Sequence, residues 1–101
     1  MAPVHRRYFM NTLLVGYDLN KSGQKYEELI DFLKKQTNWW HYLDSTWLIR
    51  TTDTATAFRD KLVNQGFIDT NDEVLVINVT GDSAAWYGFD DKGSKWLKDN
   101  L

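Results

Sequence analysis

The most constraining feature of the sequence is a near-continuous apolar run at residues 12–19, TLLVGYDL. Runs of this kind are typical of a central β-strand whose two faces are both covered. Four polar or small residues, Asn20 to Gly23, follow the run at once and end the strand. The chain is therefore expected to build a sheet around this strand, with Asp18 at the strand's end.

The segment after this strand changes to helical spacing. Its apolar residues recur at i, i+3, i+4 and i+7, which places them on one face of an amphipathic helix: Tyr26, Leu29, Ile30 and Leu33. Ser22 is a candidate N-cap. Two glutamates near the start and two lysines near the end match the helix dipole, so a helix is predicted here.

The middle of the chain predicts a hairpin, a second helix and a last strand. Residues 39–43 and 46–51 are rich in aromatic and β-branched side chains around the turn Asp44-Ser45. Thr52 or Asp53 then caps a helix to about Gln65, whose buried stripe holds Ala55, Phe58 and Leu62, with Gly66 as its C-cap. Residues 73–80 form the closing strand. The order βαββαβ predicts an α+β, ferredoxin-like sandwich: an antiparallel four-stranded sheet with two helices on one face.

The length of 101 residues leaves room for one domain. We assign it to residues 10–101, with a core at 10–80 and an aromatic tail at 81–101. Residues 1–9 are interpreted as a leader or extension, because Met10 offers a second start. In the tail, residues 84–89 are expected to add a fifth strand and residues 94–100 a helical turn or two.

Five tryptophans are many for a chain of this length, and two short helices cannot cover them all. A homodimer, or the tail folded back across the free face of the sheet, would shield the remainder. Trp47, Trp86 and Tyr87 are the predicted interface residues. Stacking of Trp86, Tyr87 and Phe89 on unpaired bases is the alternative use of the tail aromatics.

Composition excludes several classes of function. The chain has no cysteine, so it holds no disulfide, thiolate metal site or cysteine nucleophile. It shows no glycine-rich phosphate loop, no nucleophile elbow and no apolar run of membrane-spanning length, and a cytoplasmic location is expected by default. The formal net charge of −2 argues against tight, non-specific binding of nucleic acid.

Asp18 is the candidate catalytic and metal-binding residue, because a strand-end carboxylate can bind Mg²⁺ beside a substrate phosphate. The alternative is an ordinary turn role, with Asp18 capping the loop that follows. Lys21, Lys25 and Arg50 are candidate nucleic-acid contacts near the first loop, or simply solvated charges. A small-ligand regulatory domain is a third possibility, because ferredoxin-like sheets often serve in that way.

Three stretches resemble the small CRISPR-associated protein two family: LLVGYDL with its strand-ending Tyr-Asp, the hairpin WWHYLDSTWLIRT, and the closing strand DEVLVINVT. The likeness runs from Met10 to about Thr80. It implies a ferredoxin-like fold and a symmetric homodimer, in which Asp18 of each subunit faces the other and the pair shares Mg²⁺. Members of the family are metal-dependent nucleases on RNA or DNA, or non-catalytic scaffolds.

The resemblance thus implies a metal-dependent endonuclease, more readily an endoribonuclease, in a defence or toxin–antitoxin setting. A non-catalytic dimeric module that binds protein or nucleic acid is the alternative. Three features depart from the family's pattern. They are the negative net charge, the loop NKSGQKYEEL, which lacks an arginine-rich helix start, and the C-terminal tail. These departures indicate a stand-alone subgroup outside CRISPR adaptation.

Overall fold

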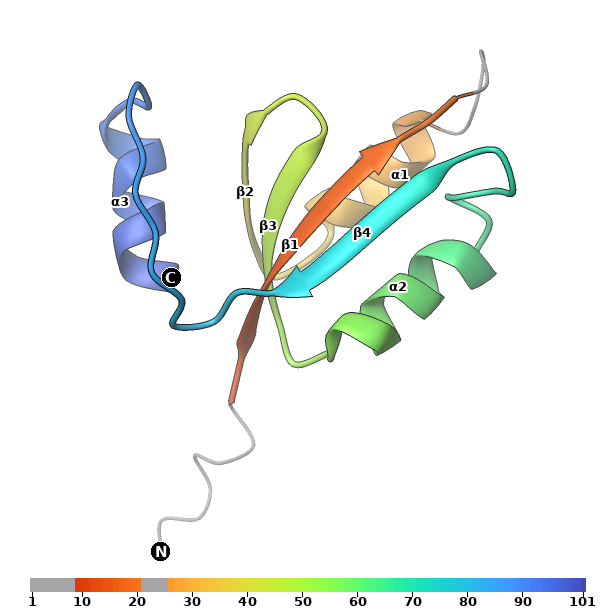
Figure 1. Cartoon of the computed structure of the whole chain (residues 1–101), viewed down its shortest axis with the longest axis horizontal. Coiled ribbons are helices and arrows are strands. Elements are labelled where there is room, and N and C mark those ends of the chain that lie inside the picture. Colours follow the sequence, from red (N-terminus) through yellow and green to blue (C-terminus); the bar gives the residue numbers. More distant parts are fainter. Residues whose placement is uncertain (1–8, 21–25) are drawn as a thin grey trace, which may run out of the picture.

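The computed structural model describes residues 9–20 and 26–101. Their elements follow the order β-α-β-β-α-β and end in a further helix (Figure 1). The bounds are β1 (Asn11–Asp18), α1 (Tyr26–Lys34), β2 (Asn38–Leu43), β3 (Thr46–Thr51), α2 (Ala55–Asn64), β4 (Glu73–Asn78) and α3 (Asp91–Asn100). All four predicted core strands and both predicted core helices are present, and their ends differ from the predictions by only a few residues.

The four strands form one sheet in the order β2-β3-β1-β4, and every neighbouring pair is antiparallel. The connections β1–α1–β2 and β3–α2–β4 each skip one strand, which is the split βαβ arrangement. The α+β, ferredoxin-like class is therefore confirmed, and β1 is one of the two central strands as its apolar run predicts.

The main core lies between the first face of the sheet and the two helices α1 and α2. Alternate residues of β1 and β3 point into it, and each helix contributes two buried side chains. These buried core residues are Leu13, Val15 and Tyr17 of β1, Trp47 and Ile49 of β3, Leu29 and Leu33 of α1, and Phe58 and Leu62 of α2. Both core helices thus cover one face, as predicted.

The helix ends show two differences from the sequence predictions. Thr54 caps α2, with its hydroxyl oxygen accepting from the Ala57 amide at 3.1 Å, rather than Thr52 or Asp53. Asp53 instead accepts from the Lys61 ammonium at 2.7 Å. Gly66 has a φ of 82°, the left-handed conformation expected after a helix. The predicted cap Ser22 lies outside the described residues.

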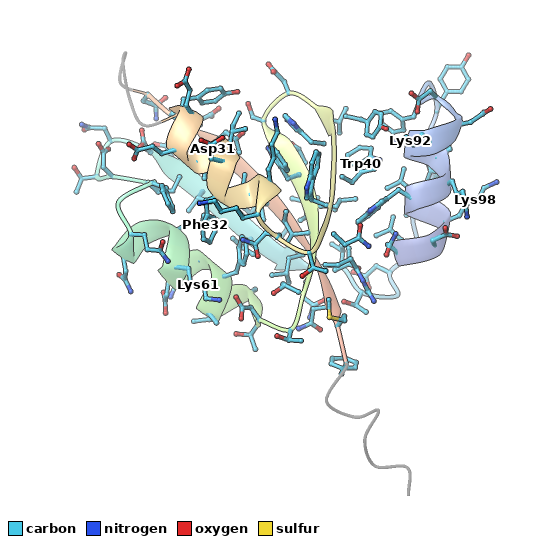
Figure 2. The ribbon with its side chains drawn as sticks, turned by 180° about the vertical axis from the view of Figure 1, so that it is seen from behind. Asp31, Phe32, Trp40, Lys61, Lys92 and Lys98 are labelled. Carbon is cyan, nitrogen blue, oxygen red and sulfur yellow. The ribbon has the colours of Figure 1, made fainter. Side chains whose placement is uncertain are left out.

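The tail crosses the second face of the sheet and ends in α3, which Asp90 caps at 2.8 Å from the Gly93 amide. Trp40, Leu48 and Leu97 form a second buried cluster there. Figure 2 shows Trp40 between the sheet and α3. The predicted fifth strand at residues 84–89 is wrong: the tail packs by its side chains, and Gly88, with a φ of 93°, interrupts extended backbone.

Within residues 9–20 and 26–101, no helix has the length and apolar character needed to cross a membrane.

Candidate functional site

Two acidic residues pair across the sheet where β1 ends and β4 begins. Asp18 and Glu73 are direct partners across these antiparallel strands, which run side by side in Figure 1. Residues 13, 15 and 17 of β1 point into the main core, so Asp18 belongs to the opposite, second face. Directly opposite side chains have Cβ atoms about 4.5–5.5 Å apart, and like charges at that spacing destabilise a sheet. A bound cation would relieve this repulsion.

The loop before β4 is fastened to the loop after β1 by Asn20. Its side-chain amide donates to the Glu73 carboxylate at 2.6 Å and to the Asn71 carbonyl at 2.7 Å. Its backbone amide donates to the Asp72 carboxylate at 2.9 Å. Glu73 is therefore held by a neighbour, whereas Asp18 is exposed and its carboxylate has no hydrogen bond or ion pair among the described residues.

A hollow of about 380 Å³ lies beside these carboxylates. Its lining combines Asp18 and Glu73 with Gly16 of β1 and with Ser45 and Thr46 from the hairpin. Acidic and hydroxyl-bearing residues therefore share this lining with the apolar residues Val74 and Leu75. Such a lining can receive a hydrated cation together with a polar ligand.

The donor set fits Mg²⁺ better than a softer metal. Mg²⁺ takes oxygen ligands, usually one or two protein carboxylates plus water and substrate phosphate. Across residues 9–20 and 26–101, no group of three or more His, Cys, Asp and Glu side chains gathers at a metal-binding distance. Asp18 and Glu73 would therefore hold the ion with only two carboxylates per chain.

Tyr17 supports the site from the core side of β1. Burial raises the pKa of its phenol to about 12, from an ordinary value of 10.0. The phenol oxygen accepts a hydrogen bond from the Trp47 indole at 3.1 Å, and the Tyr17 ring lies edge-on to Tyr26 at 6.4 Å. The neutral phenol of Tyr17 therefore ties the end of β1 to Trp47 of β3, next to Asp18.

Arg50 does not lie near Asp18, which corrects the expectation of a basic surface by the first loop. It pairs with Thr12 at the other end of β1. Six residues at about 3.4 Å each place Arg50 roughly 20 Å from Asp18 along the sheet. Its guanidinium donates to the Thr12 hydroxyl at 2.9 Å. Lys21 and Lys25 lie outside the described residues.

Of the predicted interface residues, Trp47 is fully buried beneath α1 and α2, so it is a core residue and not an interface residue. Trp86 is half-buried against the second cluster. Tyr87 is 97% exposed and is the most accessible large apolar side chain of the described part. The tail aromatics therefore lie on the second face, the face that also carries Asp18.

Glu73 and Asn20 were missed by the reasoning from sequence. The signal for Glu73 was present: in a βαββαβ sheet the last strand runs antiparallel to the first, so its first residue pairs near the first strand's end. Asn20 gave no comparable signal, because its contacts depend on the fold of the loop before β4.

The chain matches no protein-family model, no curated protein and no solved structure. The likeness to the CRISPR-associated protein two family consequently rests on its short sequence motifs, and a functional interpretation depends on the site itself.

Proposed function

We propose that this chain is a homodimeric, metal-dependent endonuclease acting on RNA or DNA, with Asp18 and Glu73 as its Mg²⁺ ligands. The observation that carries the proposal is the direct pairing of Asp18 with Glu73 on the exposed second face. Two carboxylates of like charge gain most from a shared cation. Bound Mg²⁺ would activate water and stabilise the charge that develops on a phosphodiester.

The same face supports the dimer. Leu75 and Ile77 of β4 follow Glu73 on its side of the strand, and they are 58% and 42% exposed. The core helices α1 and α2 leave this side of β4 uncovered, as Figure 1 shows. Apolar side chains left open in a row mark an association surface. A second copy seated there would bring the two Asp18 ends toward one interface.

In this arrangement each group has a distinct role. Asp18 is accessible and without a partner among the described residues, so it is the ligand that can reach the metal and the substrate. Glu73 supplies the second charge and is oriented by the Asn20 amide at 2.6 Å. Tyr17 keeps the strand end in place through its bond to Trp47.

The test is cleavage of labelled single-stranded RNA, single-stranded DNA and duplex DNA, with Mg²⁺ or with EDTA. We expect cleavage that requires the metal and falls at least a hundredfold in Asp18→Ala, because metal and nucleophile activation typically supply several kcal/mol. Asp60→Ala, on α2 with a half-exposed side chain, is the matched carboxylate control and should cleave normally. Equal cleavage by purified Asp18→Ala protein would exclude the proposed role.

A non-catalytic dimeric binding module is the second candidate. Two observations favour it. The net charge of −2 is unfavourable for binding nucleic acid, and Leu75 and Ile77 form an accessible apolar strip on β4. Complete absence of cleavage with every metal and substrate, together with an intact dimer, would select this alternative.

A further inference from the structure

A second hollow lies between the second face of the sheet and the tail. Its volume is about 410 Å³, which falls within the usual range of small-molecule sites. Leu14 and Leu48 line it from the sheet, Trp40 from β2, Trp86 and Phe89 from the tail, and Leu97 from α3. The tail therefore bridges this part of the sheet without filling it.

Hydrogen bonds near both ends of α3 attach the tail to the sheet. The Trp40 indole donates to the Gly93 carbonyl at 3.1 Å, near the start of the helix. The Trp96 indole donates to the Asn38 side chain at 2.6 Å, near its end. The Thr12 hydroxyl also donates to the Asn100 carbonyl at 2.5 Å. These anchors hold α3 against β2 and the start of β1, with Leu97 packed on Trp40 and Leu48 beside the hollow.

The lining is aromatic on several sides. The rings of Trp40 and Phe89 meet edge to face, with centroids 5.0 Å apart and planes at 88°. Trp86 and Tyr87 also line the space. Ring edges and faces set at right angles suit a flat, aromatic ligand, which would stack on one ring and meet the edge of another.

The charged side chain in the lining is acidic. Asp82 is its single charged side chain within the described part of the chain, and that carboxylate has no hydrogen bond or ion pair among the described residues. Aromatic faces attract cations through their quadrupole. An acid beside several aromatic rings therefore favours a positively charged ligand over a neutral or negative one of the same shape.

We propose that this hollow is a binding site for a small, flat aromatic cation. The site meets the hollow beside Asp18 at Thr46, but it has its own lining and does not depend on nuclease activity. It takes its selectivity for shape from Trp40, Trp86 and Phe89, and its selectivity for charge from Asp82.

The direct test uses three flat probes of similar size: N-methylquinolinium as the cation, quinoline as the neutral ring and 1-naphthoate as the anion. Each is titrated into isotope-labelled full-length protein, and the tryptophan indole signals are followed by NMR. We expect the cation to bind with a Kd on the order of 0.1–1 mM. It should shift the signals of Trp40 and Trp86 and leave that of Trp47 in place.

The core residue Trp47 is an internal control, because its indole is bonded to Tyr17 away from the hollow. Equal shifts at Trp47, or no saturable shift at Trp40 and Trp86, would overturn the site. Equal or tighter binding of 1-naphthoate would overturn its preference for cations. Shifts of Trp40 and Trp86 with protein concentration alone, if they persist in the Ile77→Asp variant of the proposed dimer face, would show that a second copy occupies the hollow, which also overturns the proposal.

Two variants separate shape from charge. Asp82→Asn should weaken the cation roughly two- to fivefold and leave quinoline unchanged, as expected for a partly solvated charge pair. Ala84→Trp should fill the hollow and abolish binding of both probes. Asp60→Asn serves as the surface control. If Asp82→Asn binds the cation as well as the unmodified chain does, the assigned role of that carboxylate is wrong.

Discussion

Burial of Tyr17 makes the stability of the folded chain depend on pH in the alkaline range. Because burial raises its pKa to about 12, the folded chain favours the neutral phenol. The unfolded chain ionises near 10.0. The stabilisation from this group is therefore complete below pH 10 and is lost as the pH rises through 12.

The corresponding prediction concerns unfolding in alkali. Denaturant unfolding between pH 8 and pH 11.5 should show the free energy of unfolding falling with pH, with Tyr17 contributing roughly 1–3 kcal/mol of that fall. Tyr17→Phe should flatten this part of the profile, although the lost bond from Trp47 should cost about 1 kcal/mol at neutral pH. Tyr87→Phe, at a 97% exposed position, is the control. Identical profiles for Tyr17→Phe and the unmodified chain would contradict the assignment.

Asp18 and Arg50 show what residue-level reasoning can and cannot provide. The polarity that ends an apolar run marks Asp18 as a strand end without any knowledge of its neighbours. Arg50 looked like its companion because both residues belong to the same predicted sheet. Their separation depends on the β1–β3 register, in which Arg50 pairs with Thr12 and not with the far end of the strand.

At the scale of elements, helical spacing of apolar residues predicted both core helices, while apolar runs and aromatic or β-branched composition predicted the four strands. Trp47 was misassigned because alternation says which residues share a face, but not which face the helices cover. The tail was misassigned for a different reason. Its aromatic side chains could pack in several ways. Their contacts with the second face of the sheet determine that the tail crosses this face as a loop and does not pair as a fifth strand.

The helix α3 gives a prediction at this scale. Asp90 caps it by accepting from the Gly93 amide at 2.8 Å, so Asp90→Ala should cost about 0.5–2 kcal/mol. The loss should be local, with hydrogen exchange rising in α3 before it rises in β1. Asp91→Ala, one residue further on and inside the first turn, is the matched control and should lose less. Equal exchange in the two variants would show that the cap does not hold the tail.

At the scale of the whole molecule, the two faces of the sheet have different roles. The first face packs against α1 and α2 and holds the main core. The second face carries the Asp18–Glu73 pair at one end and the hollow under the tail elsewhere, and Thr46 lines both spaces. All the features to which we assign function therefore share the face that the core helices leave open.

The proposed dimer is tested on this open face. Ile77→Asp places a charge in the exposed strip of β4 and should convert the dimer to a monomer, measured by light scattering after size-exclusion chromatography. Val63→Asp on α2 is the control, because its exposure of 45% is close to the 42% of Ile77. A monomeric unmodified chain, or an Ile77→Asp dimer as stable as the control, would show that β4 is not the interface.

The most direct test of the central claim locates the metal itself. Mn²⁺ is an oxygen-binding substitute for Mg²⁺, and its paramagnetism broadens the NMR signals of nearby backbone amides. We expect low Mn²⁺ to broaden residues 16–18 and 73–75 first, excess Mg²⁺ to reverse the effect, and Asp18→Asn with Glu73→Gln to abolish it. Broadening centred on other acidic residues, such as Asp82 or Asp90 and Asp91, with residues 16–18 unaffected, would contradict the proposed site.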